Sequence, residues 1–158
     1  MEMRMRTSLF LFLAALLPTQ ALAANQVALA NNVFVERVST DAQGKQRILL
    51  EEPKVVVPGD RLVFVLNYRN AGAQPAHKFV ITNPLPAAVS FADAGDTRPL
   101  VSIDGGRGWG QLDQLTVAMS DGTRRAAQPG DVTHIRWAFQ KPIPAGGSGK
   151  LMFRGVVK

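Results

Sequence analysis

The chain contains no cysteine and only two histidines, His77 and His134. Without cysteine there is no disulfide, no thiolate metal site, no cysteine nucleophile and no lipid attached through an N-terminal cysteine. Two histidines would need several carboxylates beside them to complete a zinc site. A chain of 158 residues is nevertheless long enough to be stabilised by a hydrophobic core alone.

The sequence also lacks the motifs of hydrolases and of calcium loops. No Gly-x-Ser-x-Gly motif occurs, and Ser148, flanked by glycines, is typical of a turn. Calcium loops present several oxygen ligands in one segment, but no Asp-x-Asp-x-Asp run is present. Asp93 and Asp96 share one loop, and Asp104 and Asp113 are more loosely associated. No set of acid, base and nucleophile stands out, so we predict no catalytic, cofactor or metal site and a protein that is not an enzyme.

No apolar run is long enough for a membrane-spanning helix. The longest, residues 8–17, has about ten residues where roughly 20 are needed. Two arginines precede this run, and Ala21-Leu22-Ala23 follows it, which is the layout of a secretory signal peptide. We therefore predict that residues 1–23 are removed and that residues 24–158 form one exported domain that does not span the membrane. An uncleaved anchor is the alternative.

Negative charge is in the minority, with 12 Asp and Glu against 18 Lys and Arg, a formal net charge of +6. The basic residues are scattered, and only Arg124 and Arg125 are adjacent after the signal-like segment. We interpret this pair, which follows a turn, as a solvated tip. Dispersed positive charge attracts anionic surfaces weakly. Export argues against nucleic acid as a partner, so envelope proteins or anionic envelope polymers are the candidates.

Turn residues are abundant, and they separate short segments of β-prone residues. There are 14 glycines and 10 prolines between runs rich in Val, Ile, Leu, Phe and Thr. Short strands separated by turns at this spacing predict an immunoglobulin-like antiparallel β-sandwich of about 7–9 strands. We expect strands at residues 33–39, 47–51, 61–69, 78–82, 89–91, 100–103, 115–119, 133–139 and 151–157.

Three segments make specific predictions about packing. Residues 61–69, RLVFVLNYR, are apolar on both faces in their middle, which indicates a central or doubly covered strand. Residues 133–139 alternate, with Trp137 inward and Arg136 outward. Residues 83–86 hold two prolines, which cannot continue a ladder and so predict a crossing between sheets. We place four aromatic residues in the core: Phe64, Phe79, Trp137 and Phe153.

Several motifs occur in a fixed order along the chain: the turn Pro58-Gly59-Asp60, the corner Asn70-Ala71-Gly72, the crossing Asn83-Pro84-Leu85-Pro86, Trp137, and the turn Ala145-Gly146-Gly147. In this order they resemble the DUF11 family, an immunoglobulin-like repeat of bacterial and archaeal envelope and surface proteins. The segment VSIDGGRGWGQL is similar to single-domain members from Gram-negative bacteria. The resemblance implies an immunoglobulin-like fold and a location in the periplasm or at the cell surface, and it implies no catalytic residues. Asn83 departs from the family, which usually has Asp there, and one copy stands where many members have tandem arrays.

The glycine-rich segment 105–110 is the most distinctive local feature. Its Arg107 and Trp109 form a candidate interaction loop, because Trp and Arg dominate interface energetics and Trp stacks on sugars. The alternative is that Trp109 folds down and caps one end of the sandwich.

Two functions from different classes follow. The first is a non-catalytic module of the cell envelope with a structural or protein-interaction role, because sandwiches present edge strands that recruit partners. Residues 26–32, QVALANN, could then pair within their own domain or with a neighbour, and pairing in trans would polymerise the protein. The second is a ligand-binding module, for example for polysaccharide, that uses the Trp109 loop.

Overall fold

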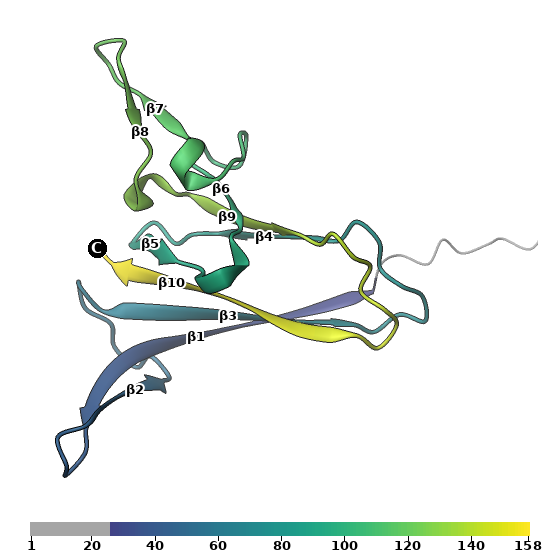
Figure 1. Cartoon of the computed structure of the whole chain (residues 1–158), viewed down its shortest axis with the longest axis horizontal. Helices are drawn as coiled ribbons and strands as arrows, with labels where there is room; N and C mark the ends of the chain where they lie inside the picture. The colour runs from purple at the N-terminus through teal and green to yellow at the C-terminus, as the bar shows by residue number, and fades with distance from the viewer. Residues whose placement is uncertain (1–25) are drawn as a thin grey trace, which may run out of the picture.

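The computed structural model describes residues 26–158, which form an all-β protein built from two antiparallel sheets (Figure 1). The first sheet has the strand order β2-β1-β3-β10-β5, and the second has the order β4-β9-β6. The all-β prediction is confirmed, and the arrangement fits the expected immunoglobulin-like sandwich. The predicted signal peptide, residues 1–23, lies outside the described residues.

The two sheets and one separate hairpin account for all strands in the described part of the chain. The helical turns are the short η1 (Gly95–Thr97), η2 (Leu112–Gln114) and η3 (Pro129–Asp131). No helix within residues 26–158 has the length and hydropathy needed to cross a membrane. The strands are β1 (Val27–Thr40), β2 (Gln46–Glu51), β3 (Arg61–Asn70), β4 (Val80–Pro84), β5 (Val89–Asp93), β6 (Leu100–Ser102), β7 (Thr116–Ala118), β8 (Arg124–Ala126), β9 (His134–Ala138) and β10 (Ser148–Val157).

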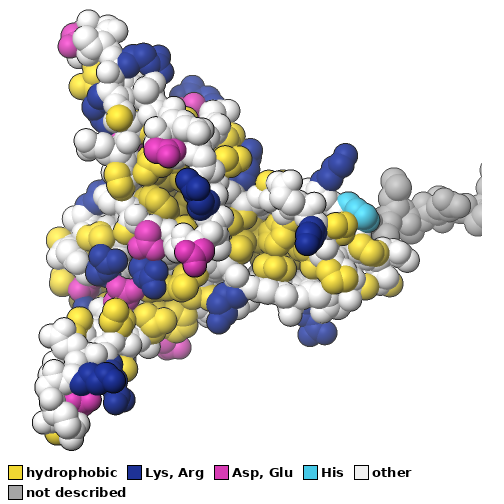
Figure 2. Space-filling model, in the orientation of Figure 1, with side chains coloured by type: hydrophobic (Ala, Val, Ile, Leu, Met, Phe, Trp, Pro, Cys, Tyr) yellow, Lys and Arg dark blue, Asp and Glu magenta, His cyan; other side chains and the backbone are white. Residues whose placement is uncertain are grey.

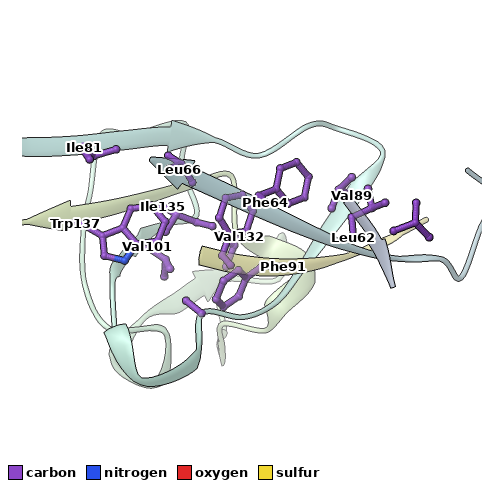
Figure 3. Close-up of a cluster of buried hydrophobic side chains, with 13 residues drawn as sticks. Leu62, Phe64, Leu66, Ile81, Val89, Phe91, Val101, Val132, Ile135 and Trp137 are labelled. Carbon is purple, nitrogen blue, oxygen red and sulfur yellow. The ribbon is translucent and has the colours of Figure 1, made fainter. Parts of the chain in front are cut away.

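The core lies between the two sheets and is built around aromatic residues (Figure 3). Phe153 is fully buried and stacks on Phe64, with ring centroids 4.4 Å apart. Trp137 approaches Phe153 from the second sheet, and its indole N–H donates a hydrogen bond of 3.1 Å to Thr97 Oγ1. These three core predictions are confirmed, and Phe79 packs against the same cluster while half-buried.

Strand β3 is central, as its two apolar faces predict. It lies between β1 and β10, and its inward residue Phe64 belongs to the core. Val63 points to the other face and is still completely buried. Its cross-strand neighbours there are Phe34 on β1 and Arg154 on β10. The outer face of this sheet is therefore covered by its own long side chains.

The corner after β3 is held by the buried side chain of Asn70. Its Nδ2 donates to the carbonyl oxygens of Gln74 at 2.8 Å and Ile143 at 2.9 Å, and its Oδ1 accepts the N–H of Gly72 at 3.0 Å. One amide thus joins the corner to the connection between β9 and β10. Because every bond is to backbone, the corner requires Asn rather than an apolar residue.

Strand β10 carries a glycine where two backbones approach closely. The register between β10 and β5 shifts between Arg154 and Gly155. A Cβ at Gly155 would collide with the Val89 side chain and lie 2.9 Å from the Ser90 carbonyl oxygen. Only glycine permits this approach of the two strands.

Several sequence predictions need correction in detail. The strand expected at residues 78–82 is β4 at residues 80–84, and β8 is absent from the predicted strands. Strand β1 begins at Val27 rather than at residue 33, because residues 27–35 pair with β3 of the same chain. The segment 26–32 therefore pairs in cis in this structure. Pro84 is the last residue of β4 rather than outside it, which an edge strand tolerates. The predicted crossing between sheets follows directly, since β4 and β5 belong to different sheets.

Candidate functional site

The glycine-rich loop 103–110 is ordered by its own acidic residue. Asp104 Oδ1 accepts hydrogen bonds from the Ser102 hydroxyl at 2.7 Å, the Arg107 N–H at 3.1 Å and the Gly108 N–H at 2.8 Å. These bonds stabilise the charged carboxylate, those from the Gly108 N–H and the Ser102 hydroxyl most, so the pKa of Asp104 is held below its ordinary value. The loop is a closed turn whose carboxylate is already engaged.

Trp109 is folded down onto strand β9. Its indole N–H donates to the Gly106 carbonyl oxygen at 2.9 Å, and the Arg136 guanidinium carbon lies 3.6 Å from the centre of the ring. His134 meets the ring edge-on. The half-buried Trp109 therefore packs on the outer face of the second sheet, as the alternative interpretation anticipates, although along β9 rather than over an end of the sandwich.

Arg107 remains exposed beside this loop. Its Nε donates to the Asp104 carbonyl oxygen at 2.9 Å, which directs the side chain along the loop. Arg107 and Trp109 lie in one loop, but Trp109 is engaged by Arg136 rather than by Arg107. Their role as an interaction loop stays a prediction.

The other polar residues named from the sequence do not converge. His77 is exposed, and His134 lies beside Trp109. Within residues 26–158, no group of three or more His, Asp or Glu side chains could hold a metal ion. Asp93 instead accepts a hydrogen bond of 3.1 Å from Arg154 Nη1. Ser148 begins β10.

The basic pair is only in part the solvated tip that the sequence suggests, because Arg124 is exposed whereas Arg125 is half-buried. Arg124 and Arg125 lie within strand β8, not at the turn. Arg125 forms two short hydrogen bonds to the Asp131 carboxylate, at 2.6 and 2.7 Å. This pairing, together with the Gln128 N–H, lowers the pKa of Asp131 to about 2. For Arg125 the sequence interpretation was wrong, because Asp131, six residues further on, folds back to the strand.

The main exposed apolar surface lies on the arm, as we call residues 36–57. The arm contains the distal end of β1, strand β2 and the connection toward β3, and it projects from the sandwich at the lower left of Figure 1. Ten large apolar side chains in the described residues are exposed, and seven of them belong to the arm. The seven are Val38, Ile48, Leu49, Leu50, Val55, Val56 and Val57.

The arm presents apolar side chains on both of its faces. Val38 pairs directly with Ile48, and both contribute to a hollow that is also lined by Arg61 and Arg154. Leu49 lies on the opposite face, opposite Arg37 in the register. Among the residues that the structure describes, no second layer covers either face of β2, whose six residues are all exposed.

A group of charged residues fixes the base of the arm to the sandwich. Glu36 accepts hydrogen bonds from Arg154 Nε at 2.7 Å and Arg61 Nε at 2.9 Å. Burial favours a higher pKa for Glu36, but these two hydrogen bonds outweigh it and lower that pKa. On the other face, Arg37 binds Asp60 at 2.6 Å and lowers the pKa of its carboxyl. The arm is thus anchored through both faces.

The tip of the arm is a tight turn closed by an aspartate. Asp41 Oδ1 accepts the backbone N–H groups of Gln43 at 3.1 Å and Lys45 at 2.9 Å. Gly44 follows in the left-handed region, with φ of 79°. With anchored base and closed tip, the arm holds its hydrophobic side chains in a fixed arrangement without a core beneath them.

Comparisons with family models, with curated proteins and with solved structures returned no match for this chain. The resemblance to the DUF11 family therefore stays a prediction.

Proposed function

We propose that the chain is a non-catalytic, exported module of the cell envelope that acts by binding another protein, with the arm as its docking surface. The observation that carries this proposal is the concentration of seven of the ten exposed large apolar side chains on one projection. Exposed apolar clusters of this kind mark interaction sites in soluble proteins. The partner is a protein surface with aliphatic side chains, because all seven exposed large apolar side chains of the arm are aliphatic and none is aromatic.

The second projection of the molecule supports this choice by contrast. Figure 2 shows the arm as the lower projection and the β7–β8 hairpin as the upper one. The hairpin exposes one large apolar side chain, Met119, and Arg125 is paired with Asp131. In the described residues, the exposed large apolar side chains gather on the arm and not on the hairpin, although both projections also carry charged and polar side chains (Figure 2).

Location and family complete the proposal. The signal-like segment supports export, to the periplasm or the cell surface, and the motifs between residues 58 and 147 support a DUF11-like module of a Gram-negative envelope. The alternative of polysaccharide binding through Arg107 and Trp109 remains open to test. Loss of glycan binding in Trp109→Ala would support it, whereas unchanged binding would count against it.

Site-specific photo-cross-linking tests the docking surface. A photoreactive residue is placed at Ile48 on the arm and, as the matched control, at Thr123 on the β7–β8 hairpin; both are exposed strand or turn positions. After irradiation in the envelope, we expect one adduct of defined mass from position 48 and none from position 123. The adduct should disappear when Val38→Lys is added. Equal adducts from both positions, or none from position 48, would contradict the proposal.

A further inference from the structure

Strand β1 has an unpaired edge over its first half. Residues 27–35 pair with β3 on one side, whereas β2 covers the other side only from Val35 to Thr40. Within the described chain, no strand pairs with the outer side of residues 27–34. Residues 28–32 are all exposed. The first sheet therefore ends in a free edge next to the arm.

Two backbone hydrogen bonds show which N–H and C=O groups of β1 point to this free edge. The Ala71 N–H donates to the Gln26 carbonyl oxygen at 2.8 Å, and the Asp41 N–H donates to the Lys45 carbonyl oxygen at 3.0 Å. Hydrogen-bonded pairs alternate along antiparallel strands. Even-numbered residues of β1 therefore bond toward β3, and odd-numbered residues bond toward the β2 side. Consequently the N–H and C=O groups of residues 27, 29, 31 and 33 point to the free edge.

This edge lacks the features that keep sheet edges apart. Residues 26–35, QVALANNVFV, contain no charged residue and no proline. Their pairing with β3 runs without a register shift, so no bulge twists the edge away. Natural proteins protect free edges with lysines, prolines or bulges, because an unprotected edge pairs with another strand. Leu29 is in addition a large apolar side chain that is 54% exposed.

We propose that the free edge of β1 pairs antiparallel with the same edge of a second copy of this chain. A two-fold axis perpendicular to the sheet passes through Ala30, so that Ala30 faces Ala30 of the second copy. Residue 27 then bonds with residue 33, and residue 29 with residue 31, of the opposite copy. All four exposed donors and acceptors of each chain are paired, through about eight hydrogen bonds in total.

The side chains fit this register and this occupant. Ala30 is small and faces the outer side of the sheet, so two copies meet at the axis without crowding. On the inner side, Val27 meets Val33 and Leu29 meets Asn31. Residues 26–35 themselves carry no charge, and the basic side chains of Arg69 and Lys150, which line a hollow beside Ala28 and Ala30, belong to the neighbouring strands rather than to the pairing edge. An unrelated strand would pair the free backbone groups of one copy of this edge. A second copy pairs the free backbone groups of both copies at once.

Strand β2 limits the assembly to a closed dimer along this edge. Glu51 of β2 lies opposite Val35, directly beyond the free residues. A partner strand is therefore confined to the positions next to residues 27–34, and the two arms lie at opposite ends of the joined sheet. The symmetry closes because each copy uses the same edge.

A single engineered cysteine tests this register in a chain without cysteine. Directly opposite residues of a non-hydrogen-bonded pair have Cα atoms about 4.5 Å apart, a distance that a disulfide spans. Two Ala30→Cys chains should therefore form a covalent dimer under mild oxidation. In the control Ala28→Cys, the two sulfurs belong to positions about 13 Å apart in the proposed register, at roughly 3.3 Å per residue. We expect little covalent dimer from it.

The native mass of the protein is the second test of the dimer, and it is independent of the test of the proposed function. We expect twice the monomer mass for the unsubstituted protein and the monomer mass for Ala30→Lys, which places two like charges at the axis but leaves the fold intact. Monomer mass for the unsubstituted protein at tens of micromolar, with equal disulfide yields from positions 28 and 30, would overturn the dimer. Because the adduct from position 48 is measured on the arm, it can persist while the dimer fails.

Discussion

Val35 and Val38 are the same residue type, three positions apart in one strand, and their surroundings are opposite. Val35 is 1% exposed, whereas Val38 is 67% exposed. Val35 pairs with Leu62 and faces the second sheet, whereas Val38, three positions further on, points to the opposite, outer face and lies beyond Arg61, where β3 begins. The comparison shows that β propensity forms the strand throughout, but the presence of an opposing layer decides whether its side chains stabilise the fold or remain available for binding.

Removing a central side chain of the sandwich should have the largest effect on stability. Phe153→Ala removes the ring stacked on Phe64, and we expect the free energy of unfolding to fall by about 3–5 kcal/mol. Leu49→Thr on the arm should change it by about 0.5 kcal/mol or less, since Leu49 is exposed. Urea unfolding followed by tryptophan fluorescence measures both. Similar losses of unfolding free energy for the two variants would contradict the distinction between the core of the sandwich and the arm.

Removing the buried amide at the corner should have the next largest effect. Asn70→Ala leaves the carbonyl oxygens of Gln74 and Ile143 without their donor, at a cost of about 1–3 kcal/mol. Asn32→Ala is the control, because its hydrogen bond with Asn67 is exposed and long, at 3.3 Å. We expect little change from this control in the same unfolding measurement. A smaller loss for Asn70→Ala than for Asn32→Ala would contradict the role given to the corner.

Acidification should loosen the base of the arm. The pKa of Glu36 is lower in the folded protein, so its ion pairs add stability above the unfolded pKa, about 4.3, and this stability is lost as the pH falls through the folded pKa. Glu36→Gln should reduce stability near neutral pH and flatten its decline below about pH 4.3. Parallel pH profiles for the two proteins would show that Glu36 contributes nothing.

Breaking the Arg125–Asp131 pair of the β7–β8 hairpin should have the smallest effect on stability, and this effect should be seen only at low pH. Asp131 has a pKa of about 2 in the folded protein, so the stability that its pairing with Arg125 contributes is fully present above about pH 3.9 and is lost as the pH falls through about 2. Asp131→Asn should remove this part of the acid profile and leave the arm unaffected. The readout is the protection of residues 124–126 against hydrogen exchange, relative to the intrinsic exchange rate at each pH, and unchanged protection between pH 4 and 2 in the unsubstituted protein would contradict it.

The sequence predicts the sandwich better than it predicts the surface. The apolar residues on both faces of 61–69 identify β3, which is packed on both faces. The alternation in residues 133–139 identifies β9, which is packed mainly on one face. Residues 26–32 gave a weak signal, since Ala and Asn have low β propensity and only pairing with β3 makes them a strand.

The candidate surface was not predicted as such. The aliphatic residues at 48–50 read as an ordinary core strand, because periodicity does not reveal whether an opposing layer exists. The exposed position of the arm depends on where β3 begins, which is a tertiary property. The Trp109 loop, by contrast, was recognised from its glycines, but its packing under Arg136 required the register of β9.

The free energy of unfolding of the double variant Val38→Thr, Ile48→Thr tests the central claim most directly. Threonine keeps the β-branched shape while removing apolar surface from a directly paired, exposed position. We predict a value within about 1 kcal/mol of the unsubstituted protein at equal concentration, because Val38 is 67% exposed and Ile48 is 66% exposed, so both contribute little to the core. A loss comparable to that of Phe153→Ala would show that the arm belongs to the core and would contradict the account.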